Sequence, residues 1–199
     1  MTANESPPYR IDPLNDHHDR AAFASGVEPL DRYLRTQAGQ DSRRRVASCF
    51  ILTRAGEPTQ VLGYYTLSAL SLALTDLPLS IAKRLPRYPI VPATLMGRLA
   101  TDSRHRGKRL GELLLFDACA RVLKSEIATF ALVVDAKDAA AELFYTRYRF
   151  LKLSAGSRRM FLPITEVAAL FACGRGSPGT PPRPSRSRCA WASVSASRK

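Results

Sequence analysis

The sequence predicts an α/β domain in which helices flank a mixed β-sheet. Segments with apolar residues at 3.6-residue spacing alternate with apolar runs rich in Val, Ile, Leu, Tyr and Thr. The expected order is helix, hairpin, strand, helix, strand, helix and strand, which favours a sheet with at least one parallel pair. With 199 residues, 45% of them hydrophobic, the chain is long enough for one core and too short for two domains of ordinary size.

The first half of the chain predicts a helix followed by a hairpin. Residues 28–43 form an amphipathic pattern, with Pro29 suited to the first helical turn. The apolar face of this helix consists of Leu30, Tyr33, Leu34, Gln37 and Ala38. Two apolar runs, 46–55 and 59–74, follow around the turn sequence GEPT and predict a β-hairpin. One of the adjacent residues Tyr64 and Tyr65 must face the core, because side chains alternate along a strand.

The second half predicts alternating strands and helices. After a proline-rich stretch at 77–92, the pattern indicates strands at 94–102, 128–136 and 158–164, with helices at 112–125 and 137–150 between them. The apolar spacing of the first of these helices begins at Leu110. A strand therefore leads through a basic, glycine-containing turn into this helix.

The last 29 residues differ in composition from the rest. Residues 171–199 contain thirteen Gly, Pro and Ser and show neither helical nor strand periodicity. We expect residues 1–170 to form the folded domain and 171–199 to form a disordered tail. A basic segment that contacts RNA and an aberrant C-terminus are two readings of this tail.

Charge and composition narrow the function classes. Of the net charge of +13, six positive charges fall in 171–199, which leaves +7 on residues 1–170. This excess favours a polyanionic partner, although charge that serves solubility explains the count equally well. Four scattered cysteines and three histidines indicate neither a disulfide framework nor a metal site. No apolar run is long enough to span a membrane or form a signal peptide, so we expect a cytoplasmic protein.

The turn between the strand at 94–102 and the following helix is suited to phosphate. Its sequence is Arg104-His105-Arg106-Gly107-Lys108-Arg109-Leu110-Gly111. Glycines allow close backbone approach, amides at a helix N-terminus point outward, and the basic side chains can pair with phosphates. Taken alone, the segment is equally well a basic surface turn.

Six motifs follow one another in the chain: GYYTLS, LPRYP, GRLATD, RGKRLGELLL, VVDAKDAAAELFY and RRMFLP. In this order they resemble motifs of the GNAT superfamily and of its TacT/AtaT branch of toxin acetyltransferases, and the resemblance covers roughly Tyr9 to Leu170. The resemblance implies the GNAT fold and acetyl-CoA as co-substrate. The cofactor-binding residues it implies are Leu99, Ala100, Thr101, Arg104, Arg106, Gly107, Lys108, Arg109, Leu110, Gly111 and Phe144.

The sequence departs from the family pattern at two positions. Arg109 stands where the family's turn has its central glycine, and its guanidinium would either obstruct pyrophosphate or pair with it. We favour pairing, which predicts weaker acetyl-CoA binding in Arg109→Gly. Arg149 stands at a predicted helix C-cap where the family has glycine, and a left-handed backbone there would be strained.

The resemblance also implies a catalytic tyrosine. Tyr145 matches the family's residue near the sulfur and is expected to act as general acid, since a phenol with a pKa near ~10 is protonated at neutral pH. Without the resemblance, an aromatic core residue is the simpler reading. Backbone amides of the strand Arg98-Leu99-Ala100-Thr101 are expected to hold the oxyanion. No general base is evident, since Glu142 lies on a different part of the helical wheel from Tyr145.

The family's acceptor is the α-amine of aminoacyl-tRNA, which would make the chain a translation-inhibiting toxin. The expected partners are aminoacyl-tRNA, a ribbon-helix-helix antitoxin and a second copy in a homodimer. Candidate tRNA-binding residues are Arg43, Arg44, Arg45, Lys83, Arg84, Arg87 and Tyr88, with Arg158 and Arg159 as a further pair. Tyr64, Tyr65 and Tyr88 are candidates to wall the acceptor pocket. Two alternatives remain: acetylation of protein or small-molecule amines, and a non-catalytic RNA-binding or regulatory module on the same scaffold.

Overall fold

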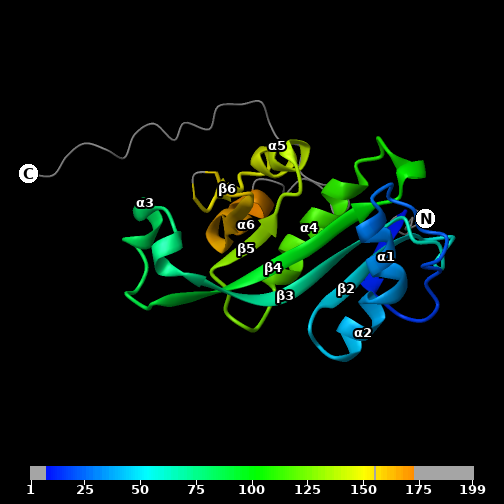
Figure 1. The fold of residues 1–199 in the computed structure, drawn as a ribbon, viewed down its shortest axis with the longest axis horizontal. Coiled ribbons are helices and arrows are strands. Elements are labelled where there is room, and N and C mark those ends of the chain that lie inside the picture. Colours follow the sequence, from blue (N-terminus) through cyan, green and yellow to red (C-terminus); the bar gives the residue numbers. More distant parts are fainter. Residues whose placement is uncertain (1–7, 155, 173–199) are drawn as a thin grey trace, which may run out of the picture.

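A computed structural model describes residues 8–154 and 156–172 of the chain. One seven-stranded sheet runs through it in the order β1-β2-β3-β4-β5-β7-β6 (Figure 1). The strands are β1 (Tyr9–Pro13), β2 (Ser48–Arg54), β3 (Gly63–Ala73), β4 (Ile90–Thr101), β5 (Ala131–Asp135), β6 (Leu151–Lys152) and β7 (Arg159–Pro163). Only the β4–β5 pair is parallel among these strands, so the mixed sheet predicted from the sequence is confirmed.

Helices cover both faces of the sheet. They are α1 (Glu28–Thr36), α2 (Ala38–Arg43), α3 (Leu79–Ala82), α4 (Leu110–Leu123), α5 (Ala139–Arg147) and α6 (Ile164–Ala172), with short 3-10 turns at Leu74–Asp76 and Ser103–His105. Figure 1 shows α1 and α2 near β2 and α3 at the opposite end of the long β3–β4 hairpin. In the described part of the chain, no helix is long and apolar enough to cross a membrane.

The core is divided by the sheet. Tyr65 packs with residues of α4, α5 and α6 on one face, whereas the neighbouring Tyr64 packs with α1 on the other. Both tyrosines are 0% exposed, because helices cover both faces at this point. The prediction that one of them walls the acceptor pocket is therefore wrong, and only the expectation that at least one faces the core holds.

The helix predicted at 28–43 is interrupted at Gln37. The Gln37 amide still donates to the carbonyl of Tyr33 at 2.9 Å, but Gln37, with φ −115° and ψ −36°, is the C-cap at which α1 ends. Ala38 is buried, whereas Gln37 is exposed. The break lets the chain bury alanine instead of a polar amide, and α2 then continues to Arg43.

Four elements lie outside the sequence prediction: β1, α3, β6 and α6. Each is short or carries a weak pattern; β1, for example, has the sequence YRIDP. Helix α6 begins directly after the last predicted strand and reaches Ala172, two residues past the predicted domain boundary at 170. The rest of the predicted tail, 173–199, lies outside the described residues.

The strands β4 and β5 diverge at the middle of the sheet. Their parallel pairing ends at Met96 and Val134, yet β4 continues beside β3 to Thr101. Gly97 has no partner on β3, because the register shifts by one residue between Thr66 and Leu67. Beyond Met96, β4 therefore has a neighbour on one side only, and its backbone groups on the other side are available to a ligand.

Candidate active site

A cavity of about 390 Å³ lies where β4 separates from β5. It is lined by Leu30 of α1, residues 96–99 of β4, Gly111 of α4, Asp135, and residues 137, 138, 140, 141, 144 and 145 at the start and on one side of α5. Leu30 packs on one face of the sheet, and Phe144 and Tyr145 pack on the other. Two reactants approaching from opposite faces could thus meet in this cavity.

Four of the predicted site residues meet here: Leu99, Gly111, Phe144 and Tyr145. A Cβ atom added to Gly111 would lie 3.9 Å from Leu99 Cδ2 and 3.9 Å from Phe144 Cζ. These three residues, which come from β4, α4 and α5, are therefore immediate neighbours. Gly111 thus places the start of α4 directly against the cavity wall that Leu99 and Phe144 form.

Tyr145 is held firmly at the cavity wall. It is 8% exposed, and its ring packs against those of Phe144 and Phe150 at centroid distances of 5.2 and 5.3 Å. Burial raises the pKa of Tyr145 above its ordinary value of 10. The phenol is therefore protonated at neutral pH, as a general acid must be.

Ala100 and Thr101 lie beyond the cavity. They pair with Tyr64 and Gly63 of β3, and neither lines the cavity wall. Residues 97–99 are the part of β4 that both lines the cavity and lacks a β5 partner. We therefore expect the amides that hold the oxyanion among these residues, and the cofactor-binding roles of Ala100 and Thr101 stay predictions.

Two residues of the basic turn, one glycine and one arginine, have a left-handed backbone conformation. Gly107 has φ +78°, and Arg109, at the N-cap of α4, has φ +57°. Glu112 and Leu113 donate the first intrahelical hydrogen bonds, both to the carbonyl of Arg109. The amides of Leu110 and Gly111 precede these bonds and are directed out of the helix end, where they suit pyrophosphate oxygens.

The Arg109 side chain folds back onto its own helix. Its guanidinium forms an ion pair with Glu112, a residue that is only 8% exposed. Tyr148 of the α5 end joins this cluster, and burial together with the nearby Glu112 raises its pKa to about 12. Phosphate therefore competes with Glu112 for Arg109.

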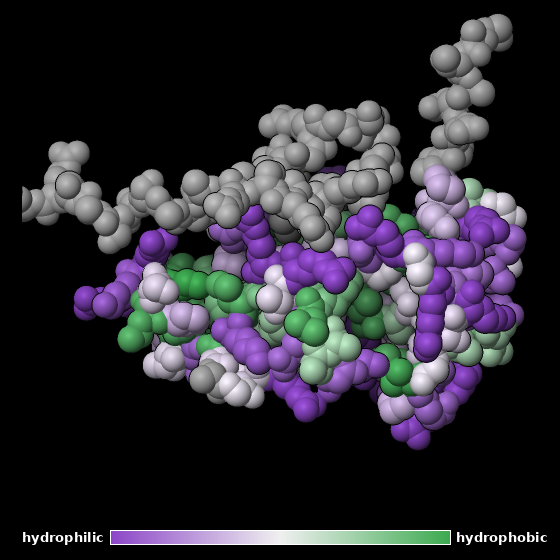
Figure 2. Space-filling model, turned by 90° about the horizontal axis from the view of Figure 1, so that it is seen from above, coloured by the Kyte–Doolittle hydropathy of each residue, from purple (hydrophilic) through white to green (hydrophobic). Residues whose placement is uncertain are grey.

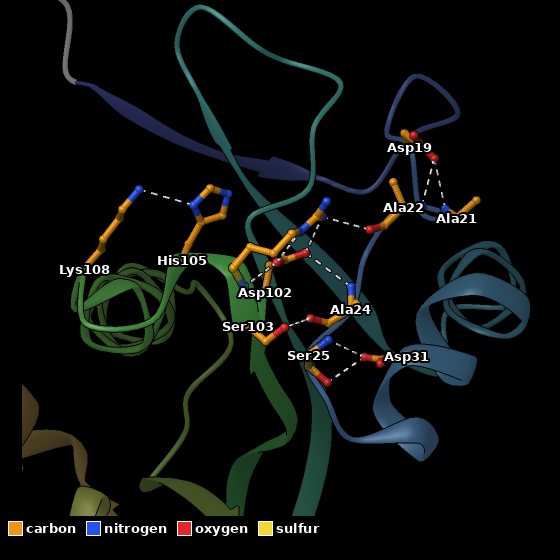
Figure 3. A network of polar contacts seen from close by, with 11 residues as sticks. Asp19, Ala21, Ala22, Ala24, Ser25, Asp31, Asp102, Ser103, His105 and Lys108 are labelled. Atoms are coloured by element: carbon orange, nitrogen blue, oxygen red, sulfur yellow. Dashed lines mark hydrogen bonds and ion pairs between the residues drawn. The ribbon is translucent and has the colours of Figure 1, made fainter.

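A buried aspartate ties the turn to the N-terminal loop (Figure 3). Asp102 is 0% exposed and accepts hydrogen bonds from the Ala24 amide and from the Arg104 amide and guanidinium. Burial alone would raise the Asp102 pKa, but these hydrogen bonds lower it to about 2. Arg104 also donates to the carbonyl of Ala22 at 2.9 Å, so its contacts serve the fold, and its phosphate role stays a prediction.

Two basic side chains of this turn remain exposed at its surface. Arg106 Nη2 would lie 3.5 Å from a Cβ atom at Gly26, which places it beside the N-terminal loop. Lys108 Nζ lies 3.3 Å from His105 Nδ1. Both side chains are free of carboxylate partners among the described residues and are placed to meet phosphates.

The predicted tRNA residues are exposed but do not form one patch. Arg43, Arg44 and Arg45 end α2, whereas Lys83, Arg84, Arg87 and Tyr88 follow α3, at the other end of the molecule in Figure 1. The face in Figure 2 is largely hydrophilic with separate hydrophobic patches. Arg158 and Arg159 do not line the cavity, but they bond two residues of its wall, at the Lys137 carbonyl and the Asp135 carboxylate.

Sequence reasoning missed all four charged side chains of the cavity wall: Arg98, Asp135, Lys137 and Asp138. Arg98 was expected to contribute only its backbone, but its side chain also lines the wall. Asp138 caps α5 by accepting from the Ala141 amide at 2.8 Å, which an aspartate directly before an Ala-rich helical run could have indicated. Glu142 bonds Lys152 at 2.8 Å and does not line the cavity, as predicted.

No protein-family model matches the chain. A tRNA-acetylating toxin of Mycobacterium tuberculosis is 35% identical to it over 160 residues, which cover 79% of this chain and 93% of that toxin. The chain belongs to the GNAT family of tRNA-acetylating toxins. The probable toxin TacT of Sinorhizobium fredii is a further relative, 28% identical over 171 residues that cover 81% of this chain and 94% of TacT.

Solved structures of GNAT toxins share this fold. A tyrosine-to-phenylalanine mutant of KacT superimposes with a TM-score of 0.77 at 26% identity, over 82% of this chain and 99% of KacT. AtaT complexed with acetyl-methionyl-tRNAfMet gives 0.75 at 30% identity, over 82% and 99%. A tyrosine-to-phenylalanine mutant of AtaT, bound to the C-terminus of the antitoxin AtaR and acetyl-CoA, gives 0.68 at 25% identity, over 82% and 98%.

Proposed function

We propose that this chain transfers the acetyl group of acetyl-CoA to the α-amine of aminoacyl-tRNA and thereby blocks translation as a toxin. The observation that carries this proposal is the cavity between β4 and α5, which brings Tyr145 to residues 97–99, where β4 has no partner on its β5 side. The known activities of the GNAT toxin relatives support the choice of acceptor.

The residues present fit acetyl-CoA. The free amides at the start of α4 and the exposed Arg106 and Lys108 would hold its phosphates, and the cavity that Gly111 helps to line would admit its pantetheine arm. Acetyl-CoA supplies a thioester acetyl group. Amides of residues 97–99 would stabilise the oxyanion, and the Tyr145 hydroxyl would donate a proton to the departing thiolate sulfur.

The acceptor amine must be neutral to react. None of the described residues that line the cavity is a histidine, Asp135 is paired with Arg159, and Asp138 caps α5. A base is nevertheless unnecessary for an amine beside an ester, because such an amine is less basic than a free α-amine with a pKa of about 7.7–8.0. Water can then accept the released proton.

The test is transfer of labelled acetyl from acetyl-CoA to a pool of aminoacyl-tRNAs, with uncharged tRNA as control. Alkaline hydrolysis of the ester should release N-acetyl amino acids. Transfer that persists on peptide amines without RNA would favour the protein or small-molecule alternative. Absence of turnover with every acceptor would favour a non-catalytic module and refute the proposal.

We further propose a homodimer, a ribbon-helix-helix antitoxin as partner, and action in the cytoplasm, where charged tRNA is found. The co-structure of AtaT with AtaR supports an antitoxin. Residues up to Ala172 would form the catalytic unit, because α6 completes the described fold. A chain that ends at Ala172 should therefore keep its melting temperature and its acetylation rate, and a large fall in either would contradict this division.

A further inference from the structure

A polar cluster joins the start of α4 to the end of α5, next to the candidate phosphate site. It consists of Arg109 at the N-cap of α4, Glu112 in the first turn of α4, and Tyr148 at the C-cap of α5. Glu112 and Tyr148 are 8% and 3% exposed, whereas the side chain of Arg109 is half exposed. Arg109 is therefore the member of the cluster that a phosphate in solvent can reach first.

The buried members of the cluster are incompletely bonded. The Glu112 carboxylate forms an ion pair with Arg109. The Tyr148 hydroxyl lies beside both groups, yet within residues 8–154 and 156–172 it has no hydrogen-bond partner of good geometry. Because a buried hydroxyl without a partner is unfavourable, such a group suits a hydrogen bond that forms in another state of the protein.

Phosphate binding would remove the ion-pair partner of Glu112. The Arg109 guanidinium can turn away from Glu112, because a phosphate at the amides of α4 offers it more acceptor oxygens than one carboxylate does. Glu112 stays behind in the first helical turn, where a buried carboxylate without a partner is strongly unfavourable. The Tyr148 hydroxyl beside it can donate, since its pKa of about 12 keeps it protonated at neutral pH.

Tyr148 also packs against the wall of the cavity. The centroid of its ring lies 5.2 Å from that of Phe144 and 5.4 Å from that of Phe116 on α4. Phe144 in turn packs against Tyr145 at 5.2 Å, and both residues line the cavity. A hydrogen bond formed by the Tyr148 hydroxyl would therefore restrain the end of α5 near the candidate proton donor.

We propose that Tyr148 is a positioning residue, which donates to Glu112 when a phosphate of acetyl-CoA takes Arg109 from that carboxylate. The proposal rests on the proposed acetyl-CoA-dependent function and adds how cofactor binding at α4 reaches α5. In the free protein Glu112 holds Arg109, whereas in the cofactor-bound protein Tyr148 holds Glu112. The exchange makes Arg109 available to phosphate and restrains the end of α5 only when the cofactor is bound.

The test is a double-mutant cycle measured by calorimetric titration with acetyl-CoA. Tyr148→Phe should weaken binding about tenfold, the scale of a hydrogen bond to a charged group, because Glu112 then lacks a donor once Arg109 leaves. Glu112→Gln should tighten binding, since it frees Arg109 beforehand. In the Glu112→Gln background, Tyr148→Phe should change the affinity by less than about twofold, because the amide carries no charge that needs a donor.

Tyr65→Phe is the matched control. Tyr65 is also buried, and its hydroxyl donates to Asp117 on the same helix α4. This variant should leave the acetyl-CoA affinity unchanged. Weakening by the same factor in Tyr65→Phe and Tyr148→Phe, or additive effects of the substitutions at 112 and 148, would assign Tyr148 a packing role and overturn the proposal.

Hydrogen exchange gives a second readout that does not depend on affinity. At saturating acetyl-CoA, the amides of 144–150 should exchange more slowly than in the free protein, and this slowing should be lost in Tyr148→Phe. If that variant folds poorly, Glu112→Gln should lose the slowing in the same way, and slowing that persists there would refute the exchange of partners. If the unmodified chain binds no acetyl-CoA, the proposed function itself fails.

Discussion

The two helices beside the cavity, α4 and α5, contribute to the site by opposite physical means. Helix α4 presents its N-terminus in an exposed turn with basic side chains, so its contribution is backbone amides and charge. Helix α5 presents its side, from which Phe144 and the buried Tyr145 reach the cavity. The comparison implies that changes at α4 should alter binding, whereas changes on the inner side of α5 should alter chemistry.

Each helix also has an arginine in the left-handed conformation, Arg109 before α4 and Arg149 after α5. Their φ angles are +57° and +67°, in the region that favours glycine. The surroundings differ: Arg109 is paired with the nearly buried Glu112 at the candidate phosphate site, whereas Arg149 only meets the partly exposed Glu166 at 3.4 Å. The same backbone strain therefore affects a ligand site in one case and stability alone in the other.

The largest expected effect is on chemistry at α5. Tyr145→Phe keeps the ring and its packing but removes the proton donor, so kcat should fall by roughly 10²–10⁴-fold with acetyl-CoA affinity little changed. Steady-state kinetics and calorimetric titration measure the two quantities. Because burial raises the Tyr145 pKa, the phenol should keep its proton through mildly alkaline pH, and kcat should not decline there through its ionisation.

Equal losses of acetyl-CoA affinity and of kcat in Tyr145→Phe would contradict the role of Tyr145 as proton donor, because they would indicate a packing role instead. A mutant as fast as the unmodified chain would remove Tyr145 from the mechanism. The use of tyrosine-to-phenylalanine mutants in solved KacT and AtaT structures is in keeping with a functional tyrosine in those proteins.

The second effect concerns the anchor of the turn before α4. The pKa of Asp102 is lowered from 3.8 to about 2, so the carboxylate stabilises the fold above pH ~4, and this contribution is lost as pH falls from about 4 to 2. Because solvent screens its exposed partner Arg104, the Asp102 carboxylate contributes only about 1–2 kcal/mol to the free energy of unfolding. Asp102→Asn should lower the free energy of unfolding by this amount at pH 7 and flatten its acid dependence. Hydrogen exchange should increase at 103–111 before it does at 139–147, and the reverse order would refute the anchor.

The third effect is on ligand affinity at α4. In Arg109→Gly, loss of a cation next to the candidate phosphate site should weaken acetyl-CoA binding by about tenfold, less than a free arginine would cause, because Glu112 competes for the guanidinium. Calorimetric titration of the unmodified chain and of Arg109→Gly with acetyl-CoA shows whether binding weakens or tightens. Tighter binding by the glycine variant would mean that Arg109 obstructs pyrophosphate. Arg109→Lys keeps the charge and tests whether charge alone accounts for the change.

Much of the fold could be predicted from local sequence pattern. Long periodic segments such as α4 and the β2–β3 hairpin were found because their apolar spacing extends over many residues. The edge strand β1 was missed because its pairing with β2, not its own sequence, stabilises it. The break at Gln37 could not be found either, because it depends on which side chain the sheet beneath can bury.

The candidate site was predicted only in part, for a related reason. Leu99, Gly111, Phe144 and Tyr145 belong to motifs that are recognisable in a single sequence, and the structure brings them together. The Arg98 side chain was overlooked because its contact with Tyr33, which is far away in sequence, forms only when α1 packs on this face of the sheet. Arg104 looked like a phosphate ligand because the sequence does not show that Asp102 already holds it.

The smallest expected effect is on stability at the end of α5. The amides of Arg149 and Phe150 close this end by donating to the carbonyls of Thr146 and Tyr145, a motif in which residue 149 must be left-handed. Arg149→Gly removes strain of about 1–2 kcal/mol but adds entropy to the unfolded chain and loses the weak contact with Glu166. The net result, measured by urea denaturation, should be a gain of about 0.5 kcal/mol in the free energy of unfolding, and kcat/KM should be unchanged.

Arg45→Gly is the matched control, since Arg45 closes α2 with the same hydrogen-bond pattern and φ +57°. A loss of stability in both variants would mean that the arginine side chains outweigh the strain, whereas a loss of activity in Arg149→Gly alone would show that this end of α5 also positions Tyr145.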